Sequence, residues 1–170
     1  MLDDADPPPG SVVLLPELFD TGFSLKVDRI ADGATLPWAT AAARRRSCTI
    51  ICGFADRGDD GLGRNCASIV SPAGDELGRY EKVHPFSYGR ETDAYAPGRR
   101  LVLRSIEGAV VCPLICYDLR FPELWRLAAL AGAEVFFIGA SWPSARQAHW
   151  RDLCVARAIE NQAYIVAVNR

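Results

Sequence analysis

Residues 110–126 read VVCPLICYDLRFPELWR, and they decide the fold because the pattern of a buried strand changes here into that of a helix. The apolar run before Cys116 has the length of a strand, and Pro122 and Glu123 suit the first turn of a helix. In open α/β sheets, reactive groups gather in the crevice outside the carboxyl ends of the strands. A cysteine in an apolar run is more often a small buried residue, so Cys116 alone leaves both interpretations open.

Two charged residues elsewhere in the chain also follow strand-like segments. Glu17 ends the apolar run VVLLPE, and Lys82 ends a short alternating segment just before VHPF. Taken singly, each would be interpreted as a solvated charge. A thiol, a carboxylate and an ammonium at strand ends are, however, the set that thiol-dependent hydrolysis of a C–N bond requires. The three residues together therefore favour catalysis at Cys116.

The rest of the chain alternates apolar segments with polar turns. This pattern predicts strands at residues 12–15, 49–54, 65–70, 76–80, 101–103, 109–115, 134–138 and 163–168, and helices at 34–46, 122–131 and 144–160. The Gly- and Asp-rich segment DRGDDGLGR is expected to close a hairpin-like connection. From residue 109 onward the strands and helices follow in βαβ rhythm, which implies parallel pairing. We expect one α/β domain over residues 1–170.

Length, composition and charge exclude several classes of protein. A chain of 170 residues with 49% hydrophobic residues can bury a real core. The net charge of −2, with no basic block longer than Arg44–Arg46, argues against a nucleic-acid partner. No apolar run reaches membrane-spanning length, and the N-terminal MLDDADPPPG is acidic and proline-rich, unlike a signal peptide. We therefore expect a cytoplasmic protein that does not bind membranes.

Six cysteines lie mostly within apolar segments, at positions 48, 52, 66, 112, 116 and 154. This placement predicts reduced thiols in a reducing compartment. Cysteines four residues apart on a strand are too far apart to share a metal ion, and the chain has only two histidines. We expect neither a metal site nor a cofactor.

Three segments of the chain resemble the signature segments of the nitrilase, or carbon-nitrogen hydrolase, superfamily. They are PELFDTGF, YEKVHPF and ICYDLRFPEL, in the order that this superfamily shows them, and the resemblance extends through GRETDAYAPG and residues 140–170. It implies a four-layer α-β-β-α sandwich. Members of the superfamily normally begin with a strand and a long helix before the match to VVLLPE and continue past the match to AVNR. We therefore expect this domain to be truncated at both ends.

The resemblance also implies a role for each matching residue. Cys116 would attack the carbonyl carbon of an amide, and Glu17 would be the general base that takes the thiol proton. Lys82 would stabilise the oxyanion, together with the backbone N–H of Tyr117. Glu91, in GRETDAY, matches a second glutamate that orients the lysine and the substrate.

Residues around these positions are given supporting roles. Asp118 and Arg120 flank the nucleophile and are expected to brace its turn. His84 and His149 are expected to hydrogen-bond loops, because the triad already supplies the proton carrier. Trp142, in the SWP segment, is expected to line the substrate pocket, although aromatic residues of this kind are more often part of the core.

The SWP segment and the run ARAIENQAY look most like the branch that hydrolyses the terminal amide of small 2-oxo-dicarboxylic monoamides, the omega-amidase type. N-carbamoyl-amine hydrolases and amidases of deaminated glutathione share the same triad. The family also implies a homodimer or larger assembly. Within RDLCVARAIENQ and just beyond it, Leu153, Ala156, Ile159 and Ala163 recur at helical spacing, as a core face or a contact face would.

Two hypotheses from other classes stay open beside the enzyme. The truncated domain could be a non-catalytic subunit that binds another chain through exposed sheet edges. A thiol redox sensor built on Cys112 and Cys116 is disfavoured, because four residues along a strand span too far for a disulfide. Release of ammonia from small amides would distinguish the enzyme from the binding subunit.

Overall fold

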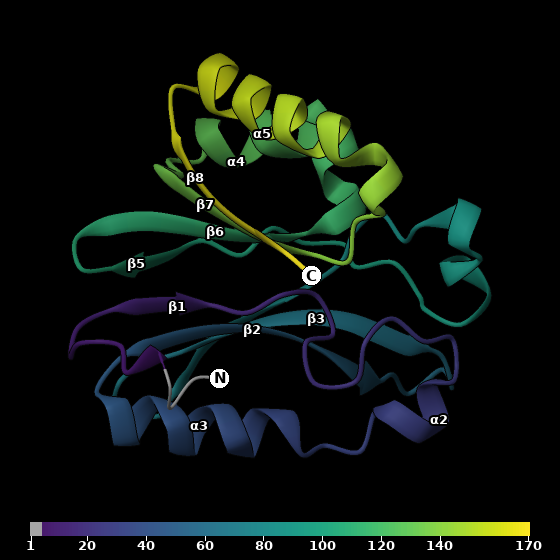
Figure 1. Ribbon diagram of the computed structural model, residues 1–170, viewed down its shortest axis with the longest axis horizontal. Coiled ribbons are helices and arrows are strands. Elements are labelled where there is room, and N and C mark those ends of the chain that lie inside the picture. The colour runs from purple at the N-terminus through teal and green to yellow at the C-terminus, as the bar shows by residue number, and fades with distance from the viewer. Residues whose placement is uncertain (1–4) are drawn as a thin grey trace.

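Two four-stranded sheets stacked face to face form the centre of the computed structural model (Figure 1). The structure describes residues 5–170, and Met1–Asp4, the start of the acidic N-terminal segment, lie outside it. The first sheet has the order β1 (Val12–Leu14), β2 (Thr49–Arg57), β3 (Gly63–Val70) and β4 (Glu76–Glu81). The second has the order β5 (Arg104–Ile106), β6 (Ala109–Ile115), β7 (Val135–Ala140) and β8 (Tyr164–Asn169).

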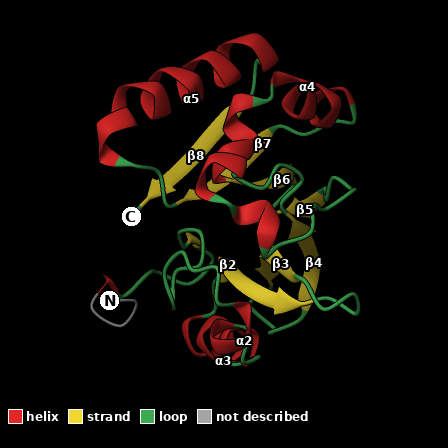
Figure 2. Ribbon diagram, turned by 90° about the vertical axis from the view of Figure 1, so that its right-hand side faces the viewer, coloured by secondary structure: helices red, strands yellow, loops and turns green. Residues whose placement is uncertain are grey.

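Helices cover both outer faces of this pair of sheets. The α-helices are α2 (Val27–Ile30), α3 (Thr35–Arg46), α4 (Pro122–Leu130) and α5 (Gln147–Asn161), and the short 3₁₀ helices are η1 (Ser87–Gly89), η2 (Glu91–Asp93), η3 (Cys116–Arg120) and η4 (Ser144–Arg146). α2 and α3 pack on the first sheet, and α4 and α5 lie outside the second, in both views (Figures 1 and 2). The predicted four-layer α-β-β-α sandwich is therefore confirmed.

Strand pairing follows the sequence pattern closely. β2 and β3 form an antiparallel hairpin around the Gly- and Asp-rich turn, and β4 pairs antiparallel with β3. β6, β7 and β8 pair in parallel, as the βαβ rhythm predicts. Within residues 5–170, no helix combines the length and the apolar content needed to cross a membrane.

The prediction of a strand at residues 101–103 is wrong. The strand in this region is β5, which pairs antiparallel with the start of β6. Glu107 and Gly108, which join them, both have positive φ angles, 50° and 85°, as a two-residue type I′ hairpin turn requires. That turn pairs the three residues just before it with β6. The apolar side chains of residues 101–103 instead pack, half-buried, against the core.

The predicted apolar stripe on the last helix faces the core only in part. Leu153 and Ala163, which lies beyond the end of α5, pack half-buried against the core, whereas Ala156 is exposed and Ile159 is 71% exposed. The one fully buried residue of α5 is Arg157, whose Nε donates to the carbonyl oxygen of Leu119 at 3.1 Å. An arginine in this position was not evident from the hydrophobic pattern.

Two glycines allow the chain after β1 to pass between the two sheets. A Cβ atom on Gly53, in β2, would lie 2.6 Å from the carbonyl oxygen of Pro16 and 2.9 Å from Cα of Glu17. A Cβ atom on Gly139, in β7, would lie 2.9 Å from the carbonyl oxygen of Leu15. Only glycine fits at either position, so the two sheets hold Glu17 from both sides.

We predict that Gly53→Ala lowers the free energy of unfolding by about 1–3 kcal/mol, because the added methyl group meets backbone that cannot move aside. Urea denaturation of both proteins measures the loss. Gly58→Ala is the matched control, since its Cβ would meet only the flexible guanidinium end of Arg64, and it should change stability by less than about 0.5 kcal/mol. Equal losses in the two variants would contradict the close approach at Gly53.

Candidate active site

Four residues singled out in the sequence meet where strands of both sheets end. Glu17 follows β1, Lys82 follows β4, Glu91 begins η2 and Cys116 follows β6. The carboxylates and the ammonium are each 1% exposed or less, and Cys116 is 7% exposed. The structure thus brings a thiol, two carboxylates and a lysine together in a site almost closed to solvent.

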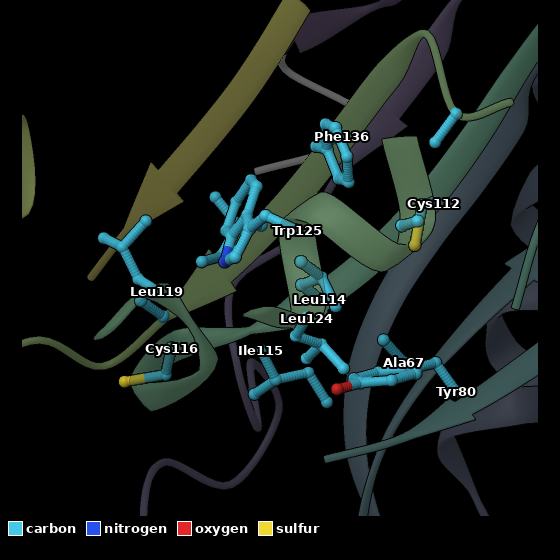
Figure 3. Packing of buried hydrophobic residues seen from close by; sticks show 14 of the residues in the cluster. Ala67, Tyr80, Cys112, Leu114, Ile115, Cys116, Leu119, Leu124, Trp125 and Phe136 are labelled. Carbon is cyan, nitrogen blue, oxygen red and sulfur yellow. The ribbon is translucent and has the colours of Figure 1, made fainter. Parts of the chain in front are cut away.

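Cys116 occupies a sharp turn between β6 and η3. Its φ angle is 45°, in the left-handed region, which is uncommon for a residue other than glycine and costs about 1–3 kcal/mol. Figure 3 shows Cys116 at the rim of the apolar cluster, with its sulfur directed away from Trp125 and Phe136. The thiol is therefore turned out of the core, as the position after a strand predicts.

Asp118 holds this turn in place from a fully buried position. Its carboxylate accepts hydrogen bonds from the backbone N–H of Ile115 at 3.1 Å, the Tyr80 hydroxyl at 2.8 Å and the backbone N–H of His84 at 3.0 Å. Its carbonyl oxygen accepts one from Trp125 Nε1 at 3.0 Å. The expectation that Asp118 braces the turn is confirmed.

Both histidines contact side chains of η3 and not the loops that the sequence analysis expects, and His149 itself lies in α5. His84 Nδ1 lies 3.0 Å from the Asp118 carboxylate, and its ring stacks on Phe121 with centroids 3.7 Å apart. His149 Nδ1 lies 3.3 Å from the guanidinium of Arg120. Arg120 therefore does not brace the turn as predicted. Its guanidinium carbon lies 4.9 Å from the centre of the Trp142 ring.

Lys82 joins the two carboxylates of the site. Its Nζ lies 2.7 Å from Glu17 Oε1 and 2.8 Å from Glu91 Oε2. Glu17 Oε2 also accepts the backbone N–H of Ser141 at 2.9 Å, and Glu91 Oε2 accepts the backbone N–H of Phe86. Because each carboxylate accepts both the lysine and a backbone N–H, neither carboxylate can turn away from the lysine without losing a hydrogen bond.

Asn65 is a member of this cluster that the sequence analysis missed. Its Nδ2 donates to Glu17 Oε1 at 2.9 Å and to Glu91 Oε1 at 2.7 Å. The one signal was an asparagine inside a segment that otherwise reads as a buried strand, where this residue type is depleted. The hydrogen bond from the backbone N–H of Ser141 could not be predicted from the sequence, because it forms only where β7 ends beside Glu17.

Burial and charge set the protonation states of the site. Burial alone would raise the pKa of Glu17, but the charge of Lys82 and its hydrogen bonds hold the pKa of that carboxyl below its ordinary 4.5. Burial opposes the charge on Lys82, yet Glu17 above all raises the pKa of the lysine. Burial, and then the Glu17 charge, raise the pKa of Cys116 well above 9.0. At neutral pH the site therefore holds a charged Glu17, a charged Lys82 and a neutral thiol.

This arrangement suits proton transfer followed by nucleophilic attack. The Cys116 thiol faces the Glu17 carboxylate and the backbone N–H of Ser141. A charged carboxylate beside a neutral thiol can accept its proton as the sulfur attacks, which is how a buried thiol is activated on demand. The backbone N–H of Tyr117 lies in the first turn of η3, where N–H groups have no partner within the helix.

Tyr117 and Trp142 form aromatic walls beside these groups. The ring of Tyr117 meets Phe86 edge-on, with centroids 5.0 Å apart. Trp142 lines a cavity of about 580 Å³ together with Ser141 and Arg170, although most of its ring is buried. Among residues 5–170, no group of three or more His, Cys, Asp or Glu side chains is arranged to hold a metal ion.

Comparison with known proteins places these features in a family. Residues 8–170 match the carbon-nitrogen hydrolase family. The chain is 35% identical over 162 residues to the 2-oxoglutaramate amidase of Bacillus subtilis, covering 93% of this chain and 62% of that protein. It is also 35% identical to the omega-amidase YafV of Escherichia coli K12, with 94% of this chain and 61% of that protein covered.

A solved structure agrees with this match. The fold resembles XC1258 from Xanthomonas campestris, a CN-hydrolase superfamily protein solved with an arsenic adduct in its active site, with a TM-score of 0.86 and 36% identity. That comparison covers 94% of this chain and 63% of the other, so the chain spans somewhat less than two thirds of the proteins it matches. Sequence, fold and comparisons agree that this chain belongs to the carbon-nitrogen hydrolase family.

Proposed function

We propose that the chain carries the active site of a thiol-dependent amidase that hydrolyses the C–N bond of small linear amides. The observation that carries the proposal is the carboxylate of Glu17 facing the thiol of Cys116, with Lys82 bonded to the same carboxylate at 2.7 Å. A carboxylate, a thiol and a fixed positive charge are the groups that acyl transfer through a thioester requires.

Each residue has one part in the reaction. Glu17 takes the thiol proton while the sulfur of Cys116 attacks the carbonyl carbon, and Lys82 and the backbone N–H of Tyr117 stabilise the oxyanion. The C–N bond then breaks, and the proton passes from Glu17 to the departing ammonia or amine. Glu17 next takes a proton from the water that attacks the thioester, which releases the carboxylic acid and restores the thiol.

Glu91 and Trp142 support these steps. Glu91 accepts from Lys82 Nζ at 2.8 Å and so orients the ammonium toward the reacting carbonyl group. Trp142 stands directly after Ser141, whose backbone N–H donates to Glu17, so the tryptophan forms a wall beside the base. Neither residue exchanges a proton with the substrate in this scheme.

We further propose that the substrate is a 2-oxo-dicarboxylic monoamide, the omega-amidase type. The names of two similar proteins, a 2-oxoglutaramate amidase and an omega-amidase, support this class. Such a substrate carries a carboxylate at the end opposite the reacting amide. A cation a short distance from the nucleophile is needed to bind that carboxylate. Arg120 ends the 3₁₀ helix that begins with Cys116 and lies half-buried over Trp142, so its guanidinium is suited to that carboxylate.

We predict that Cys116→Ala abolishes the release of ammonia from small amides and leaves the fold intact, as judged by circular dichroism. Glu17→Gln should also slow the alkylation of Cys116 by iodoacetamide at neutral pH, because the thiol loses its base.

The substrate panel should include N-carbamoyl amines and deaminated glutathione, which test the two neighbouring activities. Activity of Cys116→Ala within tenfold of the parent would reject the nucleophile, and association with another chain without any turnover would favour a binding subunit.

Arg120 provides the test of substrate class. We predict that Arg120→Gln lowers kcat/KM for a 2-oxo-dicarboxylic monoamide by about tenfold to a hundredfold, the value of a charge-assisted hydrogen bond. The matched control is a neutral amide of similar size, whose kcat/KM should change less than about threefold. A loss of the same size for both substrates would show that Arg120 acts only through its contacts with Trp142 and His149 and does not recognise a carboxylate.

A homodimer or larger assembly is proposed as well. Large apolar side chains are exposed on α5 and on the two elements that it contacts, α4 and β8: Leu127 and Leu130 on α4, Val155 and Ile159 on α5, and Tyr164 and Val166 on β8. A patch of this kind marks a protein–protein contact. Light scattering should give a mass of at least two chains for the parent and one chain for Ile159→Glu. A monomeric parent would contradict the proposal.

The compartment is a further proposal. The six cysteines are all free thiols. We propose the reducing environment of the cytoplasm for this chain, because free thiols of this number are typical of such compartments. Imaging of the tagged protein in its source cells tests it, and an extracytoplasmic signal would contradict it.

A further inference from the structure

One side chain of the ion cluster has no part in the proposed reaction. Asn65 lies in β3, is 2% exposed, and its amide nitrogen donates to Glu17 and Glu91 at 2.9 and 2.7 Å. Lys82 Nζ contacts the same two carboxylates at 2.7 and 2.8 Å. The four side chains thus close a ring in which an amide and an ammonium each bridge both carboxylates.

We propose that Asn65 is a positioning residue, whose two amide N–H groups hold the carboxylates of Glu17 and Glu91 in place on either side of Lys82. The inference rests on the proposed function, because it concerns the protonation state of the base. Asn65 touches neither the substrate nor the thiol in this account.

The charge balance of the site shows why a second bridge is needed. Two carboxylates and one ammonium leave a net charge of −1 in a space closed to water, and like charges at short range raise the pKa of one carboxyl group. One lysine cannot neutralise both. An amide supplies two further donors without adding a charge, so each carboxylate gains a second hydrogen bond inside the ring.

The orientation of the amide agrees with this role. Asn65 Oδ1 has no hydrogen-bond partner among the residues that the structure describes, so the donors alone fix the side chain. A buried acceptor without a partner is unfavourable. The two hydrogen bonds to charged groups on the other side of the amide offset that loss, since bonds to ions are the stronger kind.

The surroundings of Glu17 identify which groups set its pKa. The ionisable groups that face it are Lys82 from the end of β4, Glu91 from η2, Cys116 from the end of β6 and the more distant Tyr95. Burial raises the pKa of Glu17, the charge and hydrogen bond of Lys82 lower it most, and the hydrogen bond from Asn65 lowers it further. Removing Asn65 should therefore raise the pKa of Glu17 toward neutrality.

The pH dependence of kcat/KM tests the proposal through two variants. Asn65→Ala removes both donors, and Asn65→Asp keeps the shape of the side chain while it replaces the donors by a further carboxyl group. The acid limb of the profile should move up by about one pH unit or more in Asn65→Ala, because a hydrogen bond to a charged group is worth about one to two pKa units. It should move further in Asn65→Asp. A role in packing alone predicts the opposite order, since Asp fills the space of Asn.

A second readout separates this inference from the proposed function. The rate at which iodoacetamide alkylates Cys116, followed by mass spectrometry of its peptide, depends on Glu17 as base but requires no turnover of an amide. The acid limb of the alkylation rate should show the same two shifts. If the chain hydrolyses no amide, the proposed function is overturned, but the alkylation rates still test the role of Asn65.

Ser68→Ala is the matched control for both readouts. Ser68 is buried in the same strand, and its hydroxyl donates to Glu76, away from the site. Its acid limbs should coincide with those of the parent. Acid limbs unchanged in folded Asn65→Asp would overturn the proposal. If Asn65→Ala does not fold, Asn65→Asp and the control decide it.

Discussion

The structure depends on a buried lysine held between two carboxylates. Removing one charge from water costs several kcal/mol even after a protein relaxes around it, so Lys82 can be buried only because Glu17 and Glu91 lie 2.7 and 2.8 Å away. The three residues come from the ends of two strands and from a short 3₁₀ helix. Their pairing therefore fixes the loops at one end of the first sheet, and Gly53 and Gly139 leave the space in which Glu17 can reach the lysine.

The same lysine decides how the thiol is activated. Lys82 keeps the pKa of Glu17 below 4.5, while burial and the Glu17 charge keep the Cys116 thiol protonated. Because the pKa of Glu17 is lower in the folded chain than in the unfolded one, its charge stabilises the fold at neutral pH. That contribution is lost only as the pH falls below 4.5. The strained turn at Cys116, braced by Asp118, then points the sulfur at the one group able to take its proton.

The sequence was informative where chemistry follows strand ends, and less so where it depends on contacts between the sheets. Glu17 and Cys116 were evident because apolar runs stop at or just before them, and Lys82 because a short alternating segment ends there. Asn65 was not, because its role exists only once β3 lies beside two segments distant in the chain. The wrong prediction of a strand at 101–103 has a related cause. The apolar residues there pack against the core, and the turn at Glu107 and Gly108 determines that β5 pairs with β6 instead.

The central claim is that the resting site holds a charged base beside a neutral thiol. Ultraviolet absorbance of the thiolate, taken as the difference between the parent and Cys116→Ser across a pH titration, measures the thiol directly. The account predicts no thiolate signal from Cys116 at neutral pH, and a signal only well above pH 9.0. A thiolate already present at neutral pH would contradict it, because Glu17 would then have no proton to take and Lys82 would be stabilising the sulfur anion instead.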